Sequence, residues 1–171
     1  MDEWGLRALF LAVAALTLVS LIVLGYFQEI SPSESKQLYE STERYFESLL
    51  VPGDFEATAT NVLVDFAPLV LSCNIPVIGP IVAGATAYYA GYTLKAQHVA
   101  TGQGDFTVIA TDVVNLLQIM AITVACAEGL FLTYKVVRRE KAEVLGTLAV
   151  ITVELGLIVL SVVIEALQAL A

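Results

Sequence analysis

The middle of the chain contains an uncharged stretch, Phe66 to Leu94, that is too long for one straight membrane crossing. As a single α-helix its 29 residues would extend about 43 Å, against a hydrocarbon core of about 30 Å. Proline removes backbone donors and clashes with the preceding turn, so we expect two helices, at about 55–72 and 79–97, joined as a hairpin. The residues expected to form the hinge are Asn74, Pro76, Gly79 and Pro80.

The composition assigns the chain to the class of membrane proteins. Of its 171 residues 58% are hydrophobic and 15% charged, and the mean hydropathy is +0.81, which is too apolar for an ordinary soluble domain. The net charge of -9 argues against nucleic acid as a partner, because binding a phosphate backbone requires a basic surface. We therefore predict an all-α protein, a single membrane domain over 1–171, with the lipid bilayer as its first partner.

Apolar runs and charged loops predict five transmembrane helices and their orientation. The expected spans are about 6–28, 55–72, 79–97, 106–134 and 144–170. A cleaved signal peptide is disfavoured for the first span, since Asp2 and Glu3 precede it and no A-x-A-like site follows. The basic loop 135–143 should be cytoplasmic and the acidic segment 28–56 outside, which gives a multi-pass protein of the cell membrane with a cytoplasmic N-terminus.

The polar segment after the first span predicts an external amphipathic helix at about 31–51. Ser31 is a good N-cap, with Pro32 in the first turn and Glu34 at the third position. Apolar residues recur at helical spacing from Leu38 to Leu50, opposite an acidic face. Two interpretations remain open: a surface helix that binds a partner, or a flap that packs on the protein's own outer ends.

Two stripes of small residues predict a close contact between the third and fourth spans. Small side chains every four residues let membrane helices approach closely. The stripes are Ala83, Ala87 and Gly91 on one helix and Ala121, Ala125 and Gly129 on the other. We expect them to face each other, with the helix at 79–97 as the central packing helix.

Carboxylates inside apolar helices are the main candidates for a functional site. By predicted depth, Asp65, Glu128 and Glu154 form a cluster in the inner half of the bundle, and Asp112 and Glu165 lie in the outer half. Only Arg7 and Lys135 are available near the inner half, both closer to the interface, so we expect at least one acid to be neutral, with Glu128 at the centre of the cluster. The alternatives are a path for ions or protons and a set of hydrogen bonds that fix helix packing.

Motifs of enzymes and metal sites are missing from the sequence. It contains no HExxH, CxxC or phosphate-binding glycine loop, and its single histidine, His98, falls in a predicted loop. We give Cys73 and Cys126 a structural role, because both lie in or beside apolar segments. We therefore expect a non-enzyme without cofactor, catalytic residues or metal.

Several short motifs, in order and spacing, resemble the stage II sporulation protein M family, especially its archaeal members. They are Ile75-Pro76-Val77-Ile78-Gly79, Tyr89-Ala90-Gly91, Ala127-Glu128-Gly129-Leu130-Phe131-Leu132 and Val163-Ile164-Glu165, and the resemblance covers roughly 55–170. The chain lacks the family's paired asparagines and its Pro-His, and Gln118 stands where a family glutamate would be. The resemblance implies a non-catalytic membrane scaffold that recruits or positions partners.

Two functional hypotheses follow from the sequence. The first is this scaffold or complex subunit, with unknown membrane-protein partners and a possible homo-oligomer. The second is a small proton- or cation-coupled transporter or channel subunit that uses the intramembrane carboxylates. Carboxylates along one continuous cavity would favour transport, whereas separate hydrogen-bonded pairs would favour a scaffold.

Overall fold

The computed structural model describes residues 2–103 and 111–170, and every regular element among them is an α-helix, which confirms the predicted all-α class. The elements are α1 (Glu3–Tyr26), α2 (Pro32–Leu49), α3 (Phe55–Cys73), α4 (Ile78–Thr101), α6 (Val113–Arg138) and α7 (Val144–Gln168). Residues 106–110, the expected start of the fourth span, lie outside the described residues.

Side-chain caps set the starts of α1, α2 and α3. Asp2 accepts a hydrogen bond from the Gly5 amide at 2.9 Å and begins α1. The predicted cap of α2 is a full capping box, in which Ser31 and Glu34 each accept from the other's backbone amide. Asp54 begins α3 as Asp2 begins α1: its side chain accepts a hydrogen bond from the Ala57 amide at 3.0 Å. These ends are therefore encoded locally, by residues within one helical turn.

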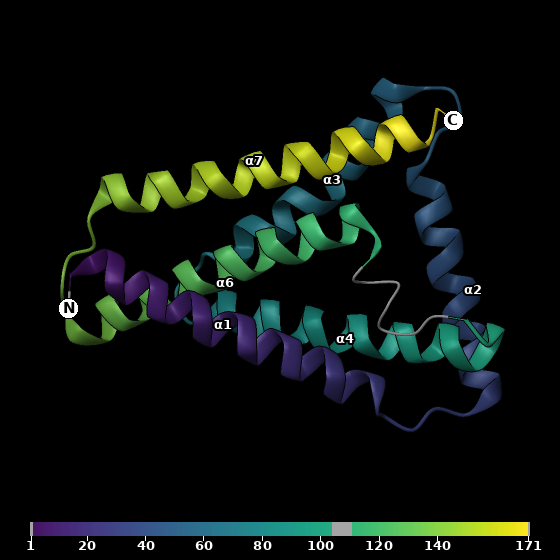
Figure 1. The fold of residues 1–171 in the computed structure, drawn as a ribbon, viewed down its shortest axis with the longest axis horizontal. Helices are drawn as coiled ribbons and strands as arrows, with labels where there is room; N and C mark the ends of the chain where they lie inside the picture. The colour runs from purple at the N-terminus through teal and green to yellow at the C-terminus, as the bar shows by residue number, and fades with distance from the viewer. Residues whose placement is uncertain (1, 104–110, 171) are drawn as a thin grey trace.

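Five helices run roughly along the long axis of the molecule, and α2 crosses one end of this bundle (Figure 1). α6 is the most buried helix and packs on α1, α3, α4 and α7. α4, which covers the helix that the sequence suggested for this central place, also packs on four helices, α1, α2, α3 and α6, and most extensively on α1. α4 also continues to Thr101, so His98 lies in a helix and not in a loop.

The core between the helices is made mostly of small and branched apolar side chains. Its fully buried members include Ala14 of α1, Val70 of α3, Ala83 of α4, Ala125 of α6 and Ile158 of α7. Cys73 and Cys126 are free and buried in this same core. Small residues at these positions let the helix backbones approach closely, as in other membrane bundles.

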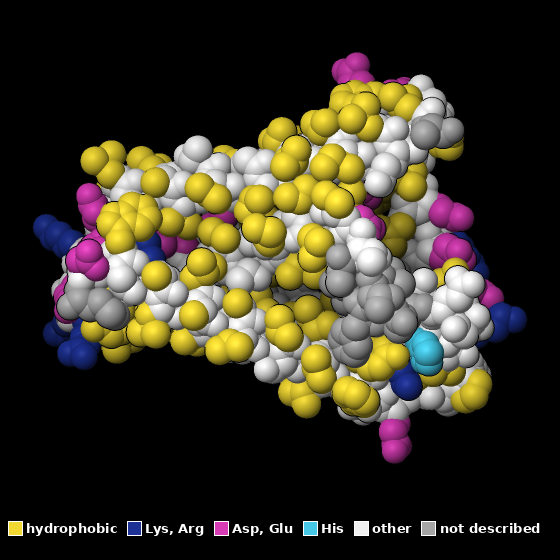
Figure 2. Space-filling view, viewed as in Figure 1, with side chains coloured by type: hydrophobic (Ala, Val, Ile, Leu, Met, Phe, Trp, Pro, Cys, Tyr) yellow, Lys and Arg dark blue, Asp and Glu magenta, His cyan; other side chains and the backbone are white. Residues whose placement is uncertain are grey.

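The outer surface of the bundle is apolar along its length. Hydrophobic side chains cover the long helices, and charged side chains gather near the two ends (Figure 2). α1, α6 and α7 are long and apolar enough to cross a membrane. α3 and α4, which we also expected to be spans, are less hydrophobic than these three helices. α3 carries Glu56 and Asp65, and α4 carries Lys95 and is rich in Gly and Tyr.

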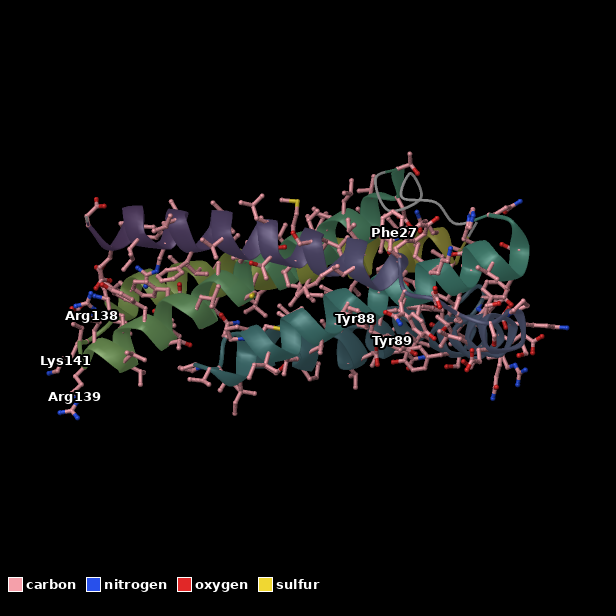
Figure 3. The ribbon with its side chains drawn as sticks, turned by 90° about the horizontal axis from the view of Figure 1, so that it is seen from below. Phe27, Tyr88, Tyr89, Arg138, Arg139 and Lys141 are labelled. Carbon is pink, nitrogen blue, oxygen red and sulfur yellow. The ribbon has the colours of Figure 1, made fainter. Side chains whose placement is uncertain are left out.

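The two ends of the bundle differ in charge and content. At one end, here called the basic end, Arg138, Arg139 and Lys141 project outward (Figure 3). The chain also begins here, and the Glu143 amide donates to Glu3 Oε2 at 3.2 Å. The opposite end, here called the α2 end, carries α2 and the C-terminus (Figure 1).

The hinge between α3 and α4 is tightly bound to α6. α3 ends at Cys73, and Val77 adopts a positive φ of 68°, which is unusual for a β-branched residue. The Val77 amide donates to Thr133 Oγ1 of α6 at 2.7 Å. At Gly79 a Cβ atom would lie 1.9 Å from the Cys73 carbonyl oxygen, so only glycine fits this turn.

Glycines mark the closest helix contact, which joins α1 and α4. A Cβ atom on Gly91 would lie 1.9 Å from the Ile22 carbonyl oxygen, and one on Gly25 would lie 2.1 Å from that of Tyr88. Gly91 therefore serves a contact with α1 and not the predicted contact with α6. Gly129 of the second stripe faces the Cys73 carbonyl at the hinge, where a Cβ would lie 2.4 Å away. The remaining stripe residues, Ala83, Ala87, Ala121 and Ala125, are all buried.

Candidate functional site

A buried ion pair near the basic end joins the first helix to the centre of the bundle. Arg7 of α1 donates from Nε to Glu128 Oε2 at 3.0 Å and from Nη2 to Oε1 at 3.3 Å. The two side chains are 7% and 1% exposed, so both charges are removed from solvent. A bidentate arginine–carboxylate pair is the geometry that best offsets the desolvation free energy of two buried charges.

A residue of a third helix bonds to both members of this pair. Thr147 of α7 accepts from Arg7 Nη2 at 3.2 Å and donates to Glu128 Oε1 at 2.8 Å. Its neighbour Gly146 provides the space, because a Cβ there would lie 2.5 Å from Arg7 Nη1. The Arg7–Glu128–Thr147 cluster thus binds α1, α6 and α7 to one another.

Aromatic rings shield the arginine. The guanidinium carbon of Arg7 lies 4.1 Å from the centre of the Phe131 ring and 5.3 Å from that of Trp4. Cation–π attraction is strongest at such desolvated sites. Phe131 is fully buried, and its ring also faces the Lys135 ammonium at 5.7 Å.

A second layer of charges connects the cluster to the surface of the basic end. Glu3 accepts from Arg7 Nη1 at 3.5 Å and pairs with Lys135 Nζ at 2.9 Å. Lys135 Nζ also lies 3.1 Å from Glu140 Oε2 in the loop after α6. The N-terminus, the end of α6 and the basic loop are therefore held together by one network of opposite charges.

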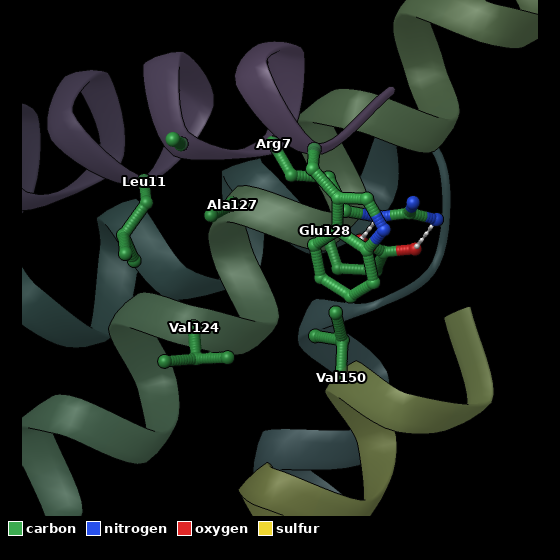
Figure 4. A pocket seen from close by; sticks show the side chains of 8 residues that line it. Arg7, Leu11, Val124, Ala127, Glu128 and Val150 are labelled. Atoms are coloured by element: carbon green, nitrogen blue, oxygen red, sulfur yellow. Dashed lines mark hydrogen bonds and ion pairs between the residues drawn. The ribbon is translucent and has the colours of Figure 1, made fainter. Parts of the chain in front are cut away.

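A pocket of about 230 Å³ opens beside the ion pair (Figure 4). Its lining is almost entirely apolar apart from Arg7 and Glu128. The lining residues are Trp4, Arg7, Ala8, Leu11, Val124, Ala127, Glu128 and Val150. Because the donors of Arg7 are directed at Glu128, Glu3 and Thr147, the pocket offers a guest apolar contacts more than hydrogen bonds.

The predicted inner cluster of three carboxylates is not what the structure contains. Glu128 is central, as expected, but it is bound to Arg7, which supplies the cation that sequence reasoning placed at the interface. Asp65 is exposed, lies near the middle of α3 and bonds to the Tyr45 hydroxyl of α2. Glu154 is fully buried and accepts from Asn74 Nδ2 at 2.6 Å.

Polar side chains of α3 hold the end of α2 and the segment after it. Asn61 Nδ2 donates to the Leu49 carbonyl at 3.3 Å, and the Thr58 hydroxyl accepts from the Val51 amide at 2.8 Å. Together with Asp65, which accepts from Tyr45, these residues bond to α2 and to the segment after it.

The two carboxylates predicted for the outer half have different roles. Asp112 is the N-cap of α6 and accepts from the Val114 amide and from Asn115 Nδ2, both at 2.9 Å. Glu165 of α7 accepts from Gln118 Nε2 of α6 at 3.4 Å. Within residues 2–103 and 111–170, no three His, Cys, Asp or Glu side chains come together in a way that could hold a metal ion.

Sequence reasoning missed Arg7 and Thr147 as members of the site. The available signals were Glu3 four residues before Arg7, which places both on one helical face, and Gly146 next to Thr147. Neither signal identifies a partner 121 residues away.

No family model, curated protein or solved structure matches the chain.

Proposed function

We propose that this chain is a non-catalytic integral membrane scaffold, a subunit that positions protein partners at the membrane. The observation that best supports the proposal is the separate pairing of the helix carboxylates: Glu128 with Arg7, Glu154 with Asn74 and Glu165 with Gln118. Two of the pairs join α6 to another helix, and the third joins the hinge after α3 to α7, so these polar groups hold the bundle together. An ion path would need carboxylates along one hydrated cavity. The resemblance to the stage II sporulation protein M family implies the same role.

In the proposed orientation the basic end faces the cytoplasm, following the excess of Lys and Arg in cytoplasmic loops. Trp4 and Phe27, both exposed, lie about 35 Å apart along α1 and fit the two interfaces of the membrane. α1, α6 and α7 cross the bilayer, and α3 and α4 form the remaining two of five spans. The hinge contact at Thr133 is five residues before Arg138, or about 8 Å from the end of α6, which suits a hairpin of nearly full depth.

We propose α2 as the surface that binds partners on the outer side. It packs mainly on α4, and it leaves the aromatic side chains of Tyr45 and Phe46 47% and 53% exposed. Exposed aromatic side chains are typical anchors of protein interfaces.

Affinity purification from native membranes tests the proposal. The wild-type chain should recover a stable partner or a second copy of itself, and Phe46→Ala should reduce that recovery about tenfold. Lys36→Ala, at another exposed position of α2, is the matched control and should leave recovery unchanged. Recovery of no partner and no self-association would contradict a scaffold.

A proton- or cation-coupled transporter is the second candidate. The observation that favours it is the burial of Glu154 beside a helix break, since broken helices at membrane depth form the ion sites of many transporters. Reconstituted vesicles with and without a pH gradient should show a flux of protons or cations if this candidate is correct. Equal leakage from vesicles with and without the protein would remove it.

A further inference from the structure

The hinge of the α3–α4 hairpin is joined to α7 by one pair of side chains. Asn74, directly after α3, donates from Nδ2 to Glu154 Oε2 at 2.6 Å. Glu154 is fully buried, ten residues into α7, so the contact lies about 15 Å from the start of that helix. Through this hydrogen bond the side chain of Asn74 joins the hinge to α7.

The second oxygen of each group has no donor among the described residues. Glu154 Oε1 and Asn74 Oδ1 are both buried, and no hydrogen-bond partner for either lies in residues 2–103 or 111–170. Buried polar atoms are nearly always satisfied, and leaving one unpaired costs free energy. The two unpaired atoms are both acceptors, and they belong to two residues that already share one hydrogen bond.

One proton satisfies both atoms at once. A carboxylic acid and a primary amide pair reciprocally: the amide N–H donates to the acid carbonyl oxygen, and the acid O–H donates to the amide oxygen. The first half of this ring is present in the bond from Asn74 Nδ2 to Glu154 Oε2. We propose that Asn74 and Glu154 form a proton-binding site, in which a proton on Glu154 Oε1 is donated to Asn74 Oδ1. The carboxylate takes this proton from water and becomes a neutral acid.

The charges around the site favour a proton over an unpaired carboxylate. α7 packs on α3 and α6. The group that α3 places nearest in sequence is the Cys73 thiol, and α6 contributes Glu128, an anion whose partner is Arg7. In the described part of the chain no Lys, Arg or His forms an ion pair with Glu154. An ionised Glu154 would therefore be a buried charge without a counterion among the described residues.

A metal cation fits the site less well. Calcium and magnesium require about six or more oxygen ligands, whereas the site offers the two unpaired oxygens. A proton needs only these two atoms. The bound proton completes the ring of two hydrogen bonds between Asn74 and Glu154, and this ring attaches the hinge to α7.

Infrared spectroscopy of the protein in lipid at neutral pH tests the proposal. The wild-type spectrum should contain a C=O stretching band of a protonated carboxyl group that is missing from the Glu154→Gln spectrum. The Glu165→Gln variant is the matched control and should retain the band. A spectrum in which Glu154→Gln removes no such band would overturn the proposal.

Stability measurements provide a second test that does not depend on the spectra. The glutamine amide forms the same reciprocal ring with Asn74, so Glu154→Gln should keep the wild-type Tm within about 2 °C, while Glu154→Leu should lower it by about 2–4 °C or more. Since the folded state holds a proton that an unfolded glutamate releases, the wild-type Tm should fall as pH rises through the acidic to neutral range, and the Tm of Glu154→Gln should fall less over the same range.

Two results would contradict the proposed proton-binding site. Equal destabilisation by glutamine and leucine would show that the ionised carboxylate is required. A wild-type Tm that rises with sodium or potassium chloride, but not with choline chloride at the same ionic strength, would identify a bound metal cation, provided that Glu154→Gln abolishes the rise.

Discussion

Arg7 and Glu128 are each buried only because the other is present. Glu128→Gln removes the negative charge and leaves the guanidinium inside the bundle without a counterion. We expect it to lower the free energy of unfolding by about 3–5 kcal/mol. Denaturant or thermal unfolding in a fixed detergent measures the change.

The double variant Arg7→Met with Glu128→Leu is the informative control. Replacing both charges with apolar groups of similar size avoids the unpaired charge, so it should recover most of the lost stability. Glu165→Gln keeps a hydrogen-bonding group beside Gln118 and should have a smaller effect than Glu128→Gln. Equal losses for these two single variants would mean that the ion pair does not contribute as proposed.

At this scale, the sequence predicts local contacts and misses distant ones. The Ser31–Glu34 capping box was predictable because both residues lie within one turn. The burial and central place of Glu128 were also foreseen. Its partner was not, since an arginine at the start of an apolar helix is usually an interfacial anchor, and only the folded bundle brings it to α6.

Among the elements, α1 and α4 make the contact that tolerates the least change. Gly91→Ala would place a methyl group 1.9 Å from the Ile22 carbonyl oxygen, so the helices must move apart. We expect a loss of about 1–3 kcal/mol, measured by unfolding in detergent. Gly156→Ala on α7 is the matched control, because its Cβ would meet no atom of the described residues within 4 Å. If both variants unfold like the wild type, the close crossing of α1 and α4 is wrong.

The helix α2 packs mainly on α4, but its C-terminal half is hydrogen-bonded to α3. Tyr45→Phe removes the hydroxyl that donates to Asp65, and we expect trypsin to cleave at Arg44 about two to five times faster. Tyr39→Phe is the control, because Tyr39 bonds within α2, to Glu43 at 2.8 Å, and its loss should leave cleavage unchanged. Wild-type cleavage rates in Tyr45→Phe would show that the bond does not hold α2.

The same bond has a pH dependence. Hydrogen bonding to Asp65, with partial burial, raises the pKa of Tyr45 from 10.0 to about 12. A raised pKa in the folded state means that the contact contributes fully below pH 10 and is lost as pH rises through 12. An ultraviolet titration of tyrosinate should show a group near pH 12 in the wild type that Tyr45→Phe lacks. Identical titrations would contradict the bond.

Helix positions were largely predictable at this scale, but helix partners were not. The apolar runs and the prolines predicted the helices to within a few residues at most ends. The stripe of Ala83, Ala87 and Gly91 correctly identified a packing face. Its partner could not be read from spacing, because Gly25 of α1 and Gly129 of α6 offer equally small surfaces.

For the whole molecule, the proposed orientation can be tested by labelling engineered cysteines. A membrane-impermeant maleimide added to intact cells should label Lys36→Cys at the α2 end, and it should label Lys141→Cys at the basic end only after the membrane is opened. Cys73 and Cys126 are buried, so the unmodified chain is the background control. Labelling of both positions from the same side would contradict the proposed arrangement of the ends.

The Arg7–Glu128 pair also has a consequence for biosynthesis. Ribosomes add about 5–20 residues per second, so Glu128 is made roughly 6–24 s after Arg7. During this interval Arg7 has no carboxylate partner on α6, and the interfacial end of α1 is where its charge can remain hydrated. α1 is then inserted before α6 and α7. The formation of the bonds from Arg7 to Glu128 and Thr147 is therefore a late step of assembly. Chains truncated before Glu128 should therefore leave α1 open to insertion chaperones and membrane proteases.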